Sequence, residues 1–449
     1  MVEIPRVRSC FEQFRQLPIG YYICLLAYVL TSFGSPMPSE VSVLEIVIGG
    51  GLLIGGLMLI KRLFSGMARS RQGRAVFFLL LMLLITPLLI SLSSGYSFRS
   101  IMRDVIPLFF LLGLPVLFVY SINLQSKAVL IWCLNISVVL VGAAASTSYW
   151  VNASEYYGSV GAAGNAMRSG LMQYQAAVKN NALPQQSESN ENGEMPKQFE
   201  YLGMYDPAVL YSCIMLCSWG VILIARSWSS SVVGGGLLAA GALMAYEILS
   251  LGLRSYALLI VLALLIVAWR QSSLRGFRTR LVPIGVLGVL LFLPQIGAML
   301  HLLWVKQMAV GTNGKVDEWA AVVSTLSQNW RDLMFGIGWG GTFENPIISA
   351  PSRFTHSLVS FYLLKSGLLG LAMLMLIIIG LYRTVPGKRD WKTLSISQLV
   401  TLVAGMSVLA IGLVFEPTYK MLSFGVILSL VLLSVSQDDC ENGSQRGQS

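Results

Sequence analysis

The sequence is short of charged residues. Only 12% of its 449 residues are Asp, Glu, Lys or Arg, whereas 55% are hydrophobic. A water-soluble domain carries about 25% charged residues. The composition therefore excludes a soluble globular protein and predicts a protein that crosses a membrane many times.

Histidine and cysteine are also scarce, with two and six residues. The two long polar segments, 150–202 and 301–355, contain no cysteine, which excludes a disulfide framework there. They also contain no Asp-x-Asp pair, and the chain has no cluster of His, Cys and carboxylates at the spacing of metal ligands. We therefore expect neither a metal nor another cofactor.

A phosphate-binding P-loop is absent as well. The glycines of Gly336-x-Gly338-x-Gly340-Gly341 are not followed by Gly-Lys-Ser/Thr. The net charge of +10 does not indicate nucleic acid either, because basic residues at the inner surface of a membrane account for most of it. No nucleic-acid partner is expected.

What the chain has instead is a series of long apolar runs. Most approach the ~20 residues that cross a ~30 Å hydrocarbon core. They predict an all-α polytopic membrane protein with about 12 transmembrane helices, forming a single domain over 1–449. The runs are 17–34, 41–60, 75–92, 105–121, 128–149, 203–225, 232–250, 255–269, 281–300, 356–381, 393–414 and 420–436.

Basic residues predict the orientation of these helices, because Lys and Arg accumulate in short cytoplasmic loops. With the N-terminus inside, most of the 31 basic residues fall in short inner segments. Both termini are then cytoplasmic, and the segments 150–202 and 301–355 lie outside. We expect the functional groups on this outer face.

The second outer segment contains apolar residues at helical spacing. They are Val316, Trp319, Val323, Leu326 and Trp330, separated by steps of three and four. This spacing predicts a helix with one apolar face, which lies either on the membrane or on the helix bundle.

His356 is the candidate catalytic residue. It lies in Arg353-Phe-Thr-His-Ser-Leu, where the polar segment meets an apolar run. An imidazole can change its charge near neutral pH, and ionisable groups at a membrane surface are costly and usually functional. The alternative is an ordinary interfacial histidine.

Three arginines are candidates for binding an anion. Arg331 and Arg353 flank the glycine turn, and Arg254 lies between two apolar runs at the outer surface. Guanidinium groups suit phosphate oxygens. The turn is expected to free backbone N–H groups, so Gly338 and Gly340 are possible supporting residues.

Glu247 lies seven residues before Arg254, on the same face of a continuous helix. An internal ion pair between the two is the alternative to anion binding by Arg254. Lys365 falls inside the apolar run after His356, where pairing or lining a cavity is the expected role.

Four motifs follow one another in a characteristic order. They are Leu253-Arg254-Ser255, Trp319-Ala-Ala-Val-Val-Ser-Thr-Leu, Phe335-Gly-Ile-Gly-Trp-Gly-Gly-Thr-Phe and His356-Ser-Leu-Val-Ser-Phe-Tyr-Leu-Leu-Lys-Ser-Gly-Leu-Leu-Gly. This order resembles the O-antigen polymerase and O-antigen ligase superfamily of bacterial envelopes, over residues 240–380. Two positions depart from the family pattern, because Ser357 replaces the commoner Asn and Lys365 stands where an acidic residue is frequent.

The resemblance implies a GT-C-like fold and glycosyl transfer from an undecaprenyl-pyrophosphate-linked oligosaccharide, on the periplasmic face of the bacterial inner membrane. The pyrophosphate is already a good leaving group, so neither a metal nor a nucleotide sugar is required. Arg254, Arg331 and Arg353 would bind the pyrophosphate, and His356 would orient or deprotonate the acceptor hydroxyl. The outer segments become the first and second periplasmic loops, the second with an interfacial helix.

Polymerase and ligase differ in the acceptor, which is a second lipid-linked repeat unit or a sugar of the lipid A core. Two outer segments of similar length favour a polymerase that builds O-antigen, capsule or exopolysaccharide. A lipid-linked saccharide transporter is the non-enzyme alternative, although the inner halves of the helices have few polar residues. Expected partners are the lipid-linked oligosaccharide, membrane lipid, a chain-length regulator and a flippase.

Overall fold

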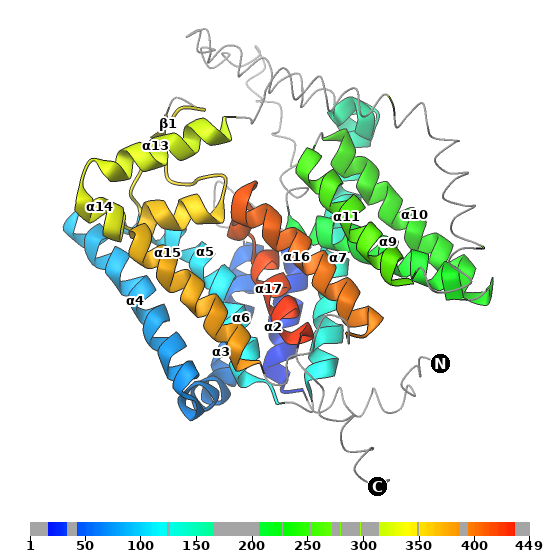
Figure 1. The fold of residues 1–449 in the computed structure, drawn as a ribbon, viewed down its shortest axis with the longest axis horizontal. Helices are drawn as coiled ribbons and strands as arrows, with labels where there is room; N and C mark the ends of the chain where they lie inside the picture. Colours follow the sequence, from blue (N-terminus) through cyan, green and yellow to red (C-terminus); the bar gives the residue numbers. More distant parts are fainter. Residues whose placement is uncertain are drawn as a thin grey trace. The chain divides into compact units, whose positions relative to one another are not determined.

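The computed structural model describes most of the apolar runs and part of the second outer segment (Figure 1). The described residues are 17–33, 43–123, 126–164, 206–226, 228–251, 253–271, 314–347, 350–385 and 394–435, with the single positions 279 and 297. They are almost entirely helical, apart from one hairpin of two three-residue strands.

The chain forms two compact units that alternate along the sequence. Unit 1 comprises Met1–Val141, Leu326–Gly341 and Ser357–Ser449, and unit 2 comprises Gly142–Thr325 and Thr342–His356. The prediction of one integral membrane domain over 1–449 stays a prediction.

Unit 1 contains most of the helices. They are α2 (Ile19–Leu30), η1 (Thr31–Phe33), α3 (Val43–Arg69), α4 (Arg71–Ser93), α5 (Phe98–Leu108), η2 (Phe109–Gly113), α6 (Leu114–Ser121), α14 (Trp330–Phe335), α15 (Leu358–Thr384), α16 (Ile396–Val414), η6 (Pro417–Lys420) and α17 (Leu422–Ser434).

Unit 2 contains three long helices, one shorter helix and the hairpin. The elements are α9 (Pro207–Arg226), α10 (Trp228–Ser250), α11 (Arg254–Gln271), most of α13 (Lys315–Ser327), β1 (Phe343–Asn345) and β2 (Ala350–Ser352). The long helix α7 (Lys127–Tyr157) contributes its first half to unit 1 and its second half to unit 2.

The protein is an all-α polytopic membrane protein. Nine helical segments among the described residues are long and apolar enough to cross a membrane, and each overlaps a predicted run. The predicted runs 17–34 and 420–436 contain the shorter apolar helices Ile19–Phe33 and Leu422–Ser434. The run 281–300 lies outside the described residues except at position 297, so the count of about 12 stays a prediction.

Three helix boundaries differ from the sequence prediction by about seven residues or more. Helix α3 continues to Arg69, beyond the predicted end at 60. The span predicted at 105–121 begins at Phe98, because its first two turns carry Arg99, Arg103 and Asp104, which interrupt the apolar pattern. Helix α7 continues to Tyr157, beyond the predicted end at 149.

Helix α13 forms where the apolar spacing predicted a helix, but its buried face is a different one. Val316, Trp319 and Val323 are exposed, Trp319 by 41%, whereas Glu318 and Val322 are buried. The alternative that this apolar face packs on the helix bundle is therefore wrong at these positions. Its position on the membrane stays a prediction.

The last two residues of this apolar series also differ from the sequence prediction. Leu326 is buried, and Trp330 begins the separate helix α14. The break occurs because the side chain of Asn329 caps α14 by accepting a hydrogen bond from the backbone N–H of Arg331, at 3.0 Å.

Helix α15 contains a break at Gly367, whose φ of +65° is accessible to glycine. A Cβ at this position would collide with the backbone of Met334 in α14. The missing side chain therefore lets α14 pack closely against α15, and Figure 1 shows the two helices side by side.

Candidate functional site

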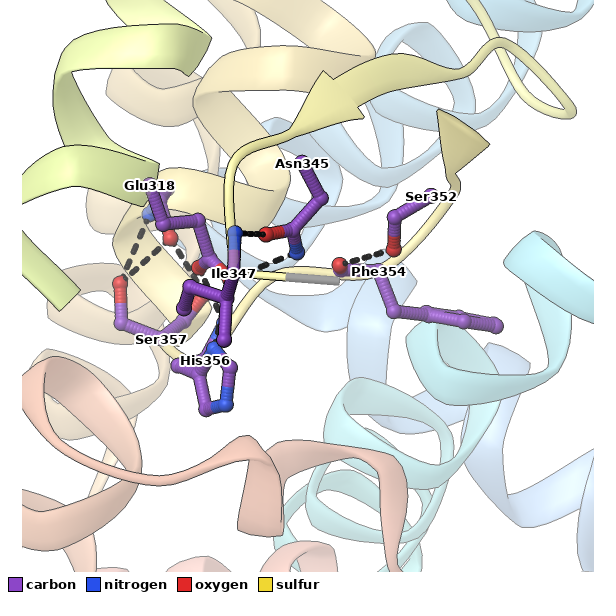
Figure 2. Close-up of polar contacts among 8 residues, drawn as sticks. Glu318, Asn345, Ile347, Ser352, Phe354, His356 and Ser357 are labelled. Carbon is purple, nitrogen blue, oxygen red and sulfur yellow. Dashed lines mark hydrogen bonds and ion pairs between the residues drawn. The ribbon is translucent and has the colours of Figure 1, made fainter. Parts of the chain in front are cut away.

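His356 and Glu318 form a hydrogen-bonded pair within unit 2 (Figure 2). Nδ1 of His356 lies 2.6 Å from Oε2 of Glu318, and the backbone N–H of His356 donates to Oε1 at 2.7 Å. Glu318 is placed by α13, and His356 directly precedes Ser357, the N-cap of α15. Two bonds to one carboxylate fix both the backbone and the ring of His356.

Asn345 holds the carboxylate from the other side. Its Nδ2 donates to Oε2 of Glu318 at 3.2 Å, and its Oδ1 accepts from the backbone N–H of Ile347 at 2.9 Å. Asn345 ends β1, where it pairs with Ala350 of β2. The hairpin therefore orients the amide, and the amide orients Glu318.

Burial and hydrogen bonding act in opposite directions on Glu318. Burial alone would raise the pKa of this carboxyl group, but the hydrogen bonds and charge of His356, together with the amide of Asn345, outweigh it. The pKa of Glu318 therefore lies below its usual value. The side chain is an ionised, buried hydrogen-bond acceptor.

This arrangement suits a general base. An ionised carboxylate can only accept, so Nδ1 of His356 carries a proton, and Nε2 is an acceptor whenever the imidazole is neutral. The side chain of His356 is 39% exposed, whereas that of Glu318 is 3% exposed. The pair can therefore present Nε2 of His356 at the surface as a proton acceptor. After proton transfer, the buried carboxylate of Glu318 stabilises the positive charge of the imidazole.

The backbone N–H groups of Gly338 and Gly340 are not free, so neither glycine offers the donor on which its predicted supporting role was based. The N–H of Gly338 donates to the carbonyl of Lys365 at 3.0 Å, and that of Gly340 donates to Oδ2 of Asp104 at 2.6 Å. The N–H groups of Gly336, Ile337 and Gly341 are also engaged by protein oxygens.

The turn is instead a packing element of unit 1. Gly338 has a φ of +84°, and a Cβ there would lie 2.8 Å from Oγ of Ser91. Trp339 is fully buried, and its indole N–H donates to the carbonyl of Leu84 at 3.2 Å. The glycines are therefore required by backbone conformation and close packing against α4.

Of the two roles expected for Lys365, pairing or lining a cavity, the structure shows a pair. Its Nζ lies 2.6 Å from Oδ2 of Asp104 and donates to the carbonyl of Gly341 at 2.5 Å. Both side chains of the ion pair are fully buried. The pair ties α5, α15 and the glycine turn together within unit 1.

The three candidate arginines do not fall in one unit. Arg331 lies exposed on α14 in unit 1, whereas Arg254 begins α11 and Arg353 follows β2 in unit 2, both partly exposed. Their convergence on one pyrophosphate therefore stays a prediction.

Glu247 is fully buried and, among the described residues, does not form the ion pair with Arg254 that was the alternative to anion binding. Both of its carboxylate oxygens instead accept from Oγ of Ser146, at 2.7 and 2.8 Å. Glu247 therefore links α10 to α7 within unit 2.

Sequence reasoning missed Glu318 and Asn345. Acidic residues are common in the first turn of a helix, so Asp317 and Glu318 are typical of an ordinary helix start. One signal was available, because Glu318, Val322 and Leu326 recur every four residues and share the buried face. A carboxylate on a buried apolar face needs a partner.

The described residues contain no group of three or more His, Cys, Asp or Glu side chains that could hold a metal ion. Comparisons with protein-family models, with curated proteins and with solved structures found no match to the chain.

Proposed function

We propose that the chain is a glycosyltransferase that polymerises undecaprenyl-pyrophosphate-linked oligosaccharide repeat units, with His356 as the general base. The observation that carries this proposal is the buried, ionised Glu318 bound to Nδ1 of a half-exposed histidine. The order of motifs, which resembles the O-antigen polymerase and ligase superfamily, supports the choice of substrate.

The proposed reaction forms one bond and breaks one bond. The acceptor hydroxyl oxygen bonds to the anomeric carbon of the donor sugar, while the bond from that carbon to the pyrophosphate oxygen breaks. The electron pair leaves with undecaprenyl pyrophosphate, and the acceptor proton moves to Nε2 of His356. A positioned base of this kind contributes about 10²–10⁴-fold to the rate.

The leaving group needs positive charge close to it. Arg254 and Arg353 belong to the same unit as His356 and are the candidates for the donor pyrophosphate, with Arg331 as the third. The proposal includes a GT-C-like arrangement of about 12 helices, cytoplasmic termini and periplasmic loops at 150–202 and 301–355. It places the enzyme in a bacterial inner membrane with a flippase and a chain-length regulator.

Replacing His356 tests the proposal in a host that makes the polysaccharide. His356→Ala should abolish the ladder of polymer lengths on a polysaccharide gel, because no base remains, while the abundance of the protein in the membrane stays unchanged. The control is His301→Ala, which removes the other histidine. A normal ladder in the His356→Ala strain would refute the catalytic role.

The acceptor is tested with the purified protein in detergent, given lipid-linked repeat units alone. Elongation under these conditions supports a polymerase and excludes transport as the main activity, since detergent abolishes any gradient. Transfer that occurs only after lipid A core is added would identify a ligase instead.

A further inference from the structure

Helix α5 has two different faces. Ile101, Asp104, Val105 and Leu108 are buried within unit 1. The opposite face is exposed and carries two arginines, Arg99 and Arg103, beside apolar side chains. Because α5 begins the segment Phe98–Ser121, which is long and apolar enough to cross a membrane, its exposed face is available to lipid.

The two arginines lie one helical turn apart, so their Cβ atoms are about 5–6 Å from each other. Neither guanidinium has a hydrogen bond or ion pair with any other described residue. The neighbouring carboxylate cannot neutralise them, because Asp104 is fully buried and paired with Lys365. Within the part of the chain that the structure describes, no carboxylate therefore pairs with the two positive charges on this face of α5.

An apolar surface continues from the arginines along the same face. Met102, Ile106 and Phe109 are all exposed, Phe109 by 56%. Met102 lies between the two arginines, and Ile106 and Phe109 follow them into the span. An anionic head group held by the arginines would thus leave its hydrocarbon chain lying against this surface. Arginines near helix ends also reach toward the head groups of ordinary anionic lipids. The charge of the head group therefore has to distinguish a specific ligand from ordinary lipid.

The glycine turn holds the first two turns of α5 in place. Gly340 donates its backbone N–H to Asp104, and a Cβ at Gly340 would lie 3.2 Å from Cβ of Tyr96 and 3.3 Å from Cβ of Ser100. The helix that carries the arginines is therefore fixed by backbone packing, which favours binding because little ordering is left to be done.

We propose that Arg99 and Arg103 bind the pyrophosphate group of a polyprenyl-pyrophosphate lipid, as a second lipid site of the enzyme. This inference rests on the proposed function, because a polymerase must hold a lipid-linked donor and a lipid-linked acceptor at once. A pyrophosphate diester carries two negative charges and matches two guanidinium groups, each of which can grip one phosphoryl group with two N–H donors. A phosphatidylglycerol head group carries one negative charge.

The experiment measures how many undecaprenyl pyrophosphate molecules the purified full-length chain retains in lipid nanodiscs, by native mass spectrometry. The wild type should retain two, and Arg99→Ala/Arg103→Ala should lose one of them. The matched control is Arg69→Ala/Arg71→Ala, which removes two exposed arginines at the opposite end of α4 and should bind as the wild type does. Arg99→Lys/Arg103→Lys keeps the charge but not the paired donors, and should weaken the second binding event about tenfold.

Two results would overturn the inference. One is unchanged stoichiometry in Arg99→Ala/Arg103→Ala. The other is full displacement of the second lipid by an equal concentration of phosphatidylglycerol, which would assign the arginines to ordinary anionic lipid. If the alanine variant does not fold, the lysine variant carries the same comparison.

The proposed function fails in a different way. His356→Ala should bind both lipids while losing polymer formation, so a normal polymer ladder in that variant removes the polymerase proposal without altering the binding result. Loss of one lipid in the arginine variant alone concerns only the second site.

Discussion

Glu318 occupies a position on α13 that an apolar residue would normally fill. Its carboxylate is stabilised there by hydrogen bonds from the backbone and ring of His356 and from the amide of Asn345. A buried charge without such partners costs several kcal/mol. The bond from the ring also holds the neutral imidazole of His356 in the tautomer that is protonated at Nδ1.

Replacing Glu318 tests whether the carboxylate orients the base. Glu318→Gln keeps the size of the side chain but removes the charge, so we expect transfer to slow by up to about 10⁴-fold, as when the carboxylate that orients a catalytic histidine is replaced by its amide. The loss should fall on kcat rather than on KM for the acceptor. Asp317→Asn removes the exposed neighbouring carboxylate and should leave the rate unchanged.

The lowered pKa of Glu318 predicts a pH-dependent stability. A carboxyl group whose pKa is lower in the folded protein stabilises the fold above its unfolded pKa of about 4.3, and this contribution is lost as the pH falls through the lower folded value. The difference in melting temperature between wild type and Glu318→Gln in detergent should therefore be full near neutral pH and vanish in acid. A difference that is independent of pH would argue against an ionised Glu318.

Sequence reasoning proposed His356 as a candidate and missed its hydrogen-bond partners for a physical reason. A histidine at the junction of a polar loop and an apolar run is rare and stands out locally. Asn345 is brought to Glu318 by a hairpin and lies 27 residues away along the chain. A pairing of this kind follows from the course of the chain, which local spacing does not reveal.

The element that sequence reasoning misread is the glycine turn between α14 and β1. Backbone N–H groups of the turn do point away from it, as expected, but they donate to oxygens of α15 and α5. Gly367 completes this interlock, because its φ of +65° lets α15 bend where α14 passes. The glycines therefore allow a close approach of one backbone segment to another, and the partners of their N–H groups are oxygens of the protein.

Removing one partner of the buried ion pair should weaken these contacts. Lys365→Met leaves Asp104 unpaired in the interior and should destabilise the protein by about 3–5 kcal/mol. Asp104→Asn/Lys365→Met should recover part of the loss, since the asparagine oxygen can still accept from Gly340. Unfolding of the single and double variants in a mild detergent measures both, and equal stability of the two would contradict the role of the pair.

At the scale of the whole molecule, the membrane spans are the part that the sequence predicts best. Apolar length is a local property, so nine predicted runs correspond to helices that can cross a membrane within the described residues. The largest error in the predicted start of a span concerns the helix that begins at Phe98, and its cause bears on the proposed second lipid site. The pattern is broken there by Arg99 and Arg103, which the proposed second lipid site uses.

The alternation of the two units along the chain has a further consequence. The chain leaves unit 2 at Thr325, passes through the segment Leu326–Gly341 of unit 1, and returns at Thr342. A cut after Gln328, in the exposed turn between α13 and α14, would leave Glu318 on one fragment and Asn345 with His356 on the other. Neither fragment would contain the hydrogen-bonded pair. Activity would therefore require that the two fragments associate, and it would report their reassembly.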